Sequence, residues 1–141
     1  MTFVPERGLS KEQYAAIAAF RFELRRFLAF SEGAATAFGL PSQQHQALLA
    51  IAGQAGPFTV GGLAEHLLVA PHTATELASR MAEAGLVTKT TSSQDRRRVE
   101  LALTPKAEGL LHRLTSAHLD ELKTLEPALA RALGRLSRPA T

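Results

Sequence analysis

The sequence has 141 residues, a formal net charge of +3, and 45% hydrophobic against 21% charged residues, which suits one folded domain with a modest core. It contains no cysteine, so disulfides, thiolate catalysis, thiol redox sensing and cysteine metal sites are excluded. Its first residues lack the apolar core of a signal peptide, and no apolar run approaches the roughly 20 residues that span a bilayer, so a cytoplasmic protein without a membrane partner is expected.

The first predicted element is a long helix over residues 10–38. Ser10 and Gln13 form a capping-box pattern at its start, and no proline interrupts it. Five of the seven phenylalanines fall in this helix, on a wider arc than one packing stripe needs, so a subunit interface is weighed equally with a core role. They are Phe20, Phe22, Phe27, Phe30 and Phe38.

Three shorter helices are predicted next, each delimited by proline, glycine or a capping residue. The first spans residues 41–53, the second spans 60–68 with Thr59 as its N-cap, and the third spans 71–84 and ends at Gly85. The short turn between the last two is typical of a helix-turn-helix. The stripe expected to be buried on the third helix is Ala74, Leu77, Met81 and Ala84.

The hydrophobic period then changes from helical to alternating. Residues 86–91 are rich in β-branched side chains, and residues 99–103 alternate apolar side chains with small or charged ones. This pattern predicts two short strands joined by the polar loop of residues 92–98. A hairpin that directly follows a helix-turn-helix is a wing.

Two more helices are predicted after the hairpin. Thr104 and Pro105 supply an N-cap and a first helical residue for one that runs to about Thr124, and Pro127 begins the other. The fold class is therefore mainly α with a small β-hairpin, in one domain over residues 1–141. Leucines spaced near 3.5 residues run through both helices, at Leu111, Leu114, Leu122, Leu125, Leu129, Leu133 and Leu136.

Positive charge is concentrated around the hairpin. Residues 80–98 hold five basic side chains against two acidic ones, a surplus as large as that of the whole chain. An arginine cluster is most often a solvated face, but the tip of a β-ribbon can enter a minor groove, where arginine meets an enhanced negative potential. We assign Arg96 and Arg98 to DNA, and Arg97 either to DNA or to a pairing with Asp95 that shapes the loop.

The helix of residues 71–84 offers a second set of candidates. His72, Thr73, Thr75 and Ser79 are short polar side chains that can approach base edges and phosphates, and the helix N-terminus favours a phosphate. Any surface helix exposes such residues, so this pattern alone does not establish DNA binding.

The hairpin carries a spaced motif. Asp95-x-Arg97 is followed, after five residues, by Leu103-Thr104. This spacing resembles the wing signature of the MarR family of winged-helix transcription regulators, and the surrounding sequence resembles the same family over roughly residues 38–125.

The resemblance implies a homodimer. Its terminal helices, residues 10–38 and 105–138, would interleave, and residues 40–104 would form a winged helix-turn-helix lobe that binds double-stranded DNA. The helix from Pro71 would lie in the major groove and the wing in the flanking minor groove. The residue roles it implies are groove contacts for Thr73, Thr75 and Ser79, a wing contact for Arg97 held by Asp95, and bracing of the wing base by Arg80.

The implied function is that of a transcription regulator, a repressor on a pseudo-palindromic operator, that uses no cofactor. Members of the family often respond to small aromatic acids, so a small aromatic or anionic effector is an expected partner. Phe27, Phe30, His45 and Arg21 are candidates to lie near it, but a core role is favoured for the aromatics and no effector site is assigned.

Two alternatives stay open. One is a winged-helix scaffold that binds protein, and the other is a helical dimer that binds a small ligand or metal without binding DNA. No two of the five histidines are three or four residues apart on one helix, so a zinc site would have to be assembled across elements. The sequence has no G-x-S-x-G, P-loop or G-x-G-x-x-G motif, which argues against an enzyme.

Overall fold

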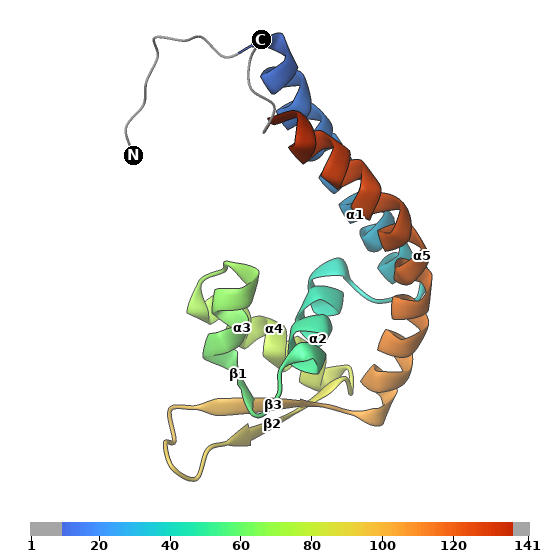
Figure 1. The fold of residues 1–141 in the computed structure, drawn as a ribbon. Helices are drawn as coiled ribbons and strands as arrows, with labels where there is room; N and C mark the ends of the chain where they lie inside the picture. Colours follow the sequence, from blue (N-terminus) through green and yellow to red (C-terminus); the bar gives the residue numbers. More distant parts are fainter. Residues whose placement is uncertain (1–9, 137–141) are drawn as a thin grey trace, which may run out of the picture. The chain divides into compact units, whose positions relative to one another are not determined.

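The structure is a computed structural model that describes residues 10–136. The chain forms two compact units: a terminal unit, made of residues up to 31 and from 117 onward, and a lobe of residues 32–116. Helices α1 and α5 contribute residues to both. The elements within the described residues are α1 (Lys11–Ala37), α2 (Ser42–Gly53), β1 (Phe58–Thr59), α3 (Val60–Leu67), α4 (Pro71–Glu83), β2 (Val87–Thr91), β3 (Val99–Leu103) and α5 (Pro105–Leu136) (Figure 1).

The lobe combines three helices with a small antiparallel sheet. The strand order is β1-β3-β2, and β3 pairs with β2 from Val87 opposite Leu103 to Thr91 opposite Val99. Helices α2, α3 and α4 lie on one side of the sheet, and the tip of the β2–β3 hairpin extends past β1 (Figure 1). This arrangement confirms the predicted helix-turn-helix and wing. The largest fully buried side chains of its core include Leu48, Leu63, Met81 and Leu114.

Local capping explains where two of the helices begin. The Ser10 backbone N–H donates to Gln13 Oε1 at 3.0 Å, and the Gln13 N–H donates to Ser10 Oγ at 3.2 Å, which is the predicted capping box. The Gly62 N–H donates to Thr59 Oγ1 at 3.0 Å at the start of α3. Both contacts satisfy amides that a helix start leaves without a backbone partner.

The end of the hairpin is tied to the end of α4. Thr104 Oγ1 donates to the Gly85 carbonyl at 2.6 Å, and the Ala107 N–H donates to Thr104 Oγ1 at 3.3 Å. Lys106 Nζ donates to the Ala84 carbonyl at 2.8 Å. Thr104 therefore both caps α5 and holds the strand end against the helix-turn-helix.

The turn of the helix-turn-helix contains a backbone outlier. Leu68 follows α3 with φ 58° and ψ 44°, in the left-handed region, and its side chain is 91% exposed. This conformation costs a residue with a Cβ about 1–2 kcal/mol, whereas glycine adopts it freely.

We expect Leu68→Gly to raise the free energy of unfolding by about 1 kcal/mol, because it removes the left-handed penalty and only an exposed side chain is lost. Urea unfolding of the full chain measures the change. Leu68→Ala is the control, since alanine keeps the Cβ and loses the same exposed surface. Equal stabilities for the two variants would show that the backbone conformation is not the cause.

The predicted helix break at Pro127 is wrong. Helix α5 runs from Pro105 to Leu136 with Pro127 inside it, so one helix of 32 residues replaces the two predicted ones. Pro127 lies on the exposed face, where water can take the carbonyl that its missing N–H leaves free. The stripe of buried residues continues past it at intervals of three, four, seven and seven residues, and comprises Leu111, Leu114, His118, Leu125 and Ala132.

Two smaller predictions also need correction. The sheet has a third strand, β1, in which Phe58 pairs with Leu101; two residues are too few to show an alternating pattern in the sequence. On α4 the fourth buried position is Ala78, whereas Ala84 is exposed at the helix end. Residues 137 and 138 of the predicted last helix lie outside the described residues.

The terminal unit has a small core and an unusually apolar surface. His118 is 7% exposed, its Nε2 lies 2.8 Å from Ser31 Oγ, and the rings of Phe27 and Phe30 meet its ring edge-on at 5.9 and 5.4 Å between centroids. Those two phenylalanines therefore pack within the unit. Seven of the ten exposed large hydrophobic residues in the described part of the chain belong to this unit, namely Tyr14, Ile17, Phe22, Leu28, Leu119, Leu122 and Leu133.

Candidate nucleic-acid interface

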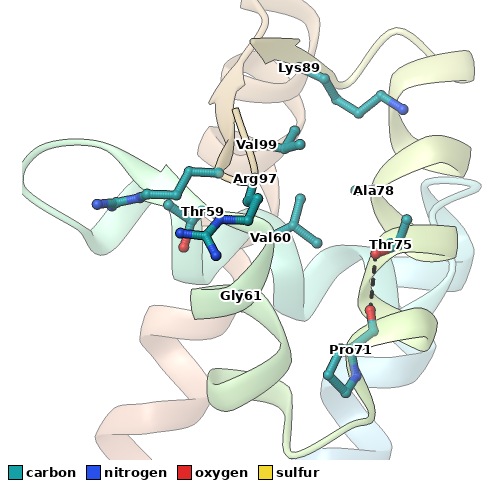
Figure 2. Close-up of a pocket in the computed structure, with 10 residues that line it drawn as sticks. Thr59, Val60, Gly61, Pro71, Thr75, Ala78, Lys89, Arg97 and Val99 are labelled. Atoms are coloured by element: carbon teal, nitrogen blue, oxygen red, sulfur yellow. Dashed lines mark hydrogen bonds between the residues drawn. The ribbon is translucent and has the colours of Figure 1, made fainter. Parts of the chain in front are cut away.

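A cleft opens in the lobe between the start of α3, one side of α4 and the base of the wing (Figure 2). It has a volume of 320 Å³. Three of its lining side chains are cationic: Lys89 comes from β2, and Arg97 and Arg98 come from the hairpin loop. None of the described residues that line it is acidic, so the cleft presents a concentrated positive charge beside α4.

The loop at the wing tip is organised by Asp95. The Arg98 N–H donates to the Asp95 carbonyl at 2.9 Å, and the Arg97 N–H donates to Asp95 Oδ1 at 3.0 Å. This is a β-turn reinforced by an Asx turn, in which the carboxylate takes the place of a backbone acceptor. The Ser92 N–H closes the loop by donating to the Arg98 carbonyl at 2.8 Å.

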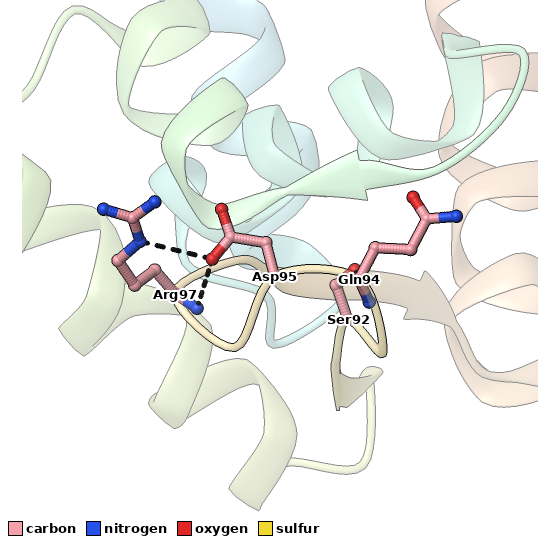
Figure 3. Close-up of polar contacts among 4 residues, drawn as sticks. All are labelled: Ser92, Gln94, Asp95 and Arg97. Atoms are coloured by element: carbon pink, nitrogen blue, oxygen red, sulfur yellow. Dashed lines mark hydrogen bonds and ion pairs between the residues drawn. The ribbon is translucent and has the colours of Figure 1, made fainter.

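Of the three adjacent arginines, Arg97 is the one paired with this carboxylate. Its Nε lies 3.2 Å from Asp95 Oδ1, while its side chain remains 92% exposed (Figure 3). The guanidinium is therefore held in direction without being removed from solvent. Its remaining N–H donors stay available for an outside acceptor such as a phosphate.

The same contacts act on the pKa of Asp95. The Arg97 backbone N–H, followed by its side-chain N–H, lowers the pKa of this carboxyl below its ordinary value of 3.8, because both donate to the charged form. A lowered pKa means that the contact is fully present above pH 3.8 and is lost as the pH falls through the lower, folded-state value.

We expect an NMR titration of the Asp95 carboxyl carbon to give a pKa below 3.8 in the wild-type chain. In Arg97→Ala the pKa of Asp95 should lie between the wild-type value and the ordinary value of 3.8, because the backbone N–H donor of residue 97 remains and the side-chain donor is gone. An Asp95 pKa that does not respond to this substitution would contradict the pairing in solution.

The predicted contact residues of α4 differ in their surroundings. His72, Thr75 and Arg80 are exposed, whereas Thr73 and Ser79 are half-buried. Thr75 also lines the cleft, and its Oγ1 donates to the Pro71 carbonyl at 3.0 Å (Figure 2). The structure thus brings Thr75, Arg97 and Arg98 together at one cleft, while the other α4 candidates and Arg96 do not line it.

Lys89 lines the cleft and is not among the DNA-binding residues predicted from the sequence. Its Nζ donates to Ser79 Oγ at 3.2 Å and so connects β2 to α4. Strand alternation places Lys89 on the same face as the buried Val87, toward the helices, and this signal was available in the sequence. The contact at the wing base that the structure shows is thus Lys89 to Ser79, and bracing by Arg80 stays a prediction.

Metal-binding clusters and membrane-spanning helices can be sought directly in the part of the chain that the structure describes. Residues 10–136 contain no group of three or more histidines and acidic residues placed to hold a metal ion. None of the helices in the same range combines the length and apolar character that crossing a membrane requires.

Comparison with known proteins finds a family model that matches part of the lobe. Residues 38–98, from the end of α1 to the wing loop, match the family model described as MarR family. These residues contain the helix-turn-helix and the first strand of the wing, so this part of the chain is similar to the MarR family. No curated protein matches the chain in sequence.

Several solved structures share the fold over most of the chain. AbsC, a MarR family transcriptional regulator from Streptomyces coelicolor, is 19% identical with a TM-score of 0.74, covering 87% of this chain and 84% of AbsC. BpsR of Bordetella bronchiseptica, whose DNA binding is regulated by 6-hydroxynicotinic acid, is 20% identical with a TM-score of 0.65, covering 82% and 90%. A MepR mutant of Staphylococcus aureus bound to an oligodeoxyribonucleotide is 21% identical with a TM-score of 0.63, covering 75% and 78%. At these identities the likeness shows the MarR fold.

Proposed function

We propose that the protein is a homodimeric transcription regulator that binds a pseudo-palindromic site on double-stranded DNA and acts as a repressor. In this proposal residues 40–104 bind DNA and residues 10–38 and 105–138 form the dimer. A protein that covers a promoter site excludes polymerase, so repression is the expected sign. Binding to chromosomal DNA also fits a cytoplasmic protein.

The observation that carries the proposal is the cationic cleft beside α4. A helix that reads the major groove needs a neighbouring positive surface, because phosphate contacts fix its register on the duplex. That surface is supplied by Lys89, Arg97 and Arg98, which line the same cleft as Thr75 of α4. The Asp95 turn aims Arg97 before any DNA arrives, which reduces the entropy lost on binding. His72, Thr73, Ser79, Arg80 and Arg96 complete the proposed contact set.

The apolar surface of the terminal unit supports the dimer. Seven large hydrophobic residues exposed on two helices favour an interaction surface, since a monomer rarely leaves large apolar areas in water. A second copy of the same helices would cover it with a matching surface, as twofold symmetry requires.

A small-molecule effector is part of the proposal, without an assigned site. The regulation of BpsR by 6-hydroxynicotinic acid supports a small aromatic or anionic compound. The packing of Phe27 and Phe30 on His118 favours a core role for these aromatics over ligand contact.

Selection of bound sequences from random duplex DNA tests the function. The selected sites should show twofold symmetry, with half-sites about 34 Å apart, because two recognition helices related by a twofold axis lie about one DNA turn apart. Failure to enrich any sequence would favour the protein-binding scaffold. Enrichment of asymmetric sites would remove the dimer from the mechanism.

Salt dependence of the selected site's affinity tests the cleft. The three cationic side chains of the cleft, in each of two protomers, are expected to give a slope of log affinity against log salt of at least about 5 in magnitude, with a negative sign, and any phosphate contacts of Arg80 and Arg96 would make it steeper. A slope near zero would show that the cleft does not meet phosphates.

A further inference from the structure

Two hydroxyl side chains of α4 have hydrogen-bond partners of opposite kind. Thr75 Oγ1 donates to the Pro71 carbonyl at 3.0 Å, one turn earlier in the same helix (Figure 2). Ser79 follows Thr75 by four residues, so the two side chains share one helix face. Ser79 Oγ accepts from Lys89 Nζ of strand β2 at 3.2 Å. Neither hydroxyl has a second hydrogen bond within residues 10–136.

The contact with Pro71 determines what Thr75 offers to a molecule beside α4. A hydroxyl group has one proton to donate and two lone pairs that accept. Because a carbonyl can only accept, the Thr75 proton is directed to Pro71 and both lone pairs stay open. Donating to a base instead would break this bond. Thr75 is exposed, and it therefore presents a hydrogen-bond acceptor.

The contact with Lys89 has the opposite effect on Ser79. A lysine ammonium has donors only, so it occupies one lone pair of Ser79 Oγ and turns the hydroxyl proton away from Nζ. Its positive charge also disfavours a further N–H donor beside the same oxygen. No described residue accepts the Ser79 proton. Ser79 therefore presents a hydrogen-bond donor.

The base edges of the major groove differ in this same property. Cytosine N4 and adenine N6 are amino groups that donate, whereas guanine O6 and thymine O4 accept, and a serine or threonine hydroxyl ordinarily pairs with either kind. We propose that Thr75 selects a base with an amino group, cytosine or adenine, and that Ser79 selects a base with a carbonyl, guanine or thymine. Lys89 is then the positioning residue that fixes the role of Ser79. This inference rests on the proposed function and gives the base chemistry of each half-site.

The test compares the sequences that wild type and variants select from random duplex DNA. Thr75→Val keeps the shape of the side chain and removes the hydroxyl. It should lose, at one position of each half-site, a preference for cytosine or adenine of about fivefold, the net value of one neutral hydrogen bond. Thr75→Ser should retain that preference, because a serine hydroxyl can donate to the same carbonyl. Ser79→Ala should lose a preference for guanine or thymine at a second position.

Two further variants separate positioning by Lys89 from its charge. Lys89→Met keeps a long side chain without the ammonium, and it should widen the preference at the Ser79 position to cytosine and adenine. Arg98→Met removes another cation of the same cleft. It should weaken binding to all sequences alike and leave every base preference unchanged, as expected for a phosphate contact. If Lys89→Met behaved in the same way, Lys89 would have no part in positioning Ser79.

The outcomes distinguish this inference from the proposed function. If the wild type enriches a site and neither Thr75→Val nor Ser79→Ala changes any position of it, the inference is overturned and the function stands. Guanine or thymine at the position that depends on Thr75 would overturn the inference equally. A wild-type chain that enriches no sequence would remove both.

Discussion

Replacing Leu28 or Leu119 by glutamate is expected to turn the proposed homodimer into monomers and to abolish operator binding. The two side chains are 58% and 53% exposed, so a charge at either position is compatible with a folded protomer. In a dimer, burying a leucine contributes about 1.5–3 kcal/mol, and a twofold interface loses it twice. The dissociation constant of the dimer should therefore rise at least about 100-fold.

Analytical ultracentrifugation at several protein concentrations measures this change. Leu68→Glu is the matched control, because Leu68 is 91% exposed but lies in the lobe, outside the terminal helices. It should sediment as the wild type does. Dimers of undiminished stability in both terminal-helix variants, or a monomeric wild type, would show that this apolar surface has another use.

The loss of operator binding follows from the loss of the second lobe. One lobe offers one α4 and one wing, whereas a dimer makes the second contact at the effective concentration set by its own interface. The terminal-unit variants should thus bind a full operator no more tightly than they bind a single half-site. The cleft residues remain unchanged in them, so any residual DNA affinity reports on a single lobe.

The parts of the fold that were predicted correctly are those that adjacent residues determine. Thr59 caps α3 and the Ser10–Gln13 pair caps α1 through contacts three residues apart, so a single sequence contains the whole signal. Pro127 shows the opposite case. A proline taken by itself favours the first turn of a helix, so the sequence predicts a new helix there. Leu125 and Ala132, on either side of Pro127, are buried by tertiary packing, and the helix continues through the proline.

The candidate site divides in the same way. The pairing of Asp95 with Arg97 spans two residues, and the spacing of the motif already indicated it. The contact of Lys89 with Ser79 joins a strand to a helix, and the cleft exists only when α3, α4 and the wing are assembled. The sequence shows that residues 80–98 carry a net positive charge. Which of these basic side chains line the cleft beside α4 depends on the tertiary structure.

Arg97→Ala is expected to lower operator affinity by at least about 1 kcal/mol, or fivefold, and to leave the dimer intact. The side chain is 92% exposed, so its loss removes the proposed DNA contact without opening the core. Fluorescence anisotropy with the selected operator measures the affinity, and sedimentation confirms the assembly. Equal affinity for variant and wild type would remove the wing from the mechanism.

Substituting Asp95 separates charge from geometry. Asp95→Ala raises the net charge of the chain by one, which by electrostatics alone would strengthen DNA binding. It also removes the two hydrogen bonds that Arg97 donates to Asp95 Oδ1, so the guanidinium of Arg97 is no longer held in one direction. We expect this loss to outweigh the gain in charge, so that the affinity for DNA falls. Glu83→Gln changes the charge equally and leaves the loop untouched, so its affinity should not fall. A rise in affinity for both variants would mean that the Asx turn has no role in binding.

Lysine substitutions distinguish the three arginines from one another. Lysine keeps the positive charge but has no Nε–H donor at the position from which Arg97 reaches Asp95 Oδ1. Arg97→Lys should therefore lose much of the affinity that Arg97→Ala loses, whereas Arg96→Lys and Arg98→Lys should cost less, because a phosphate contact needs only their charge. Equal losses at all three positions in the anisotropy titration would reduce the wing to a uniform basic patch and leave the carboxylate of Asp95 without a directing role.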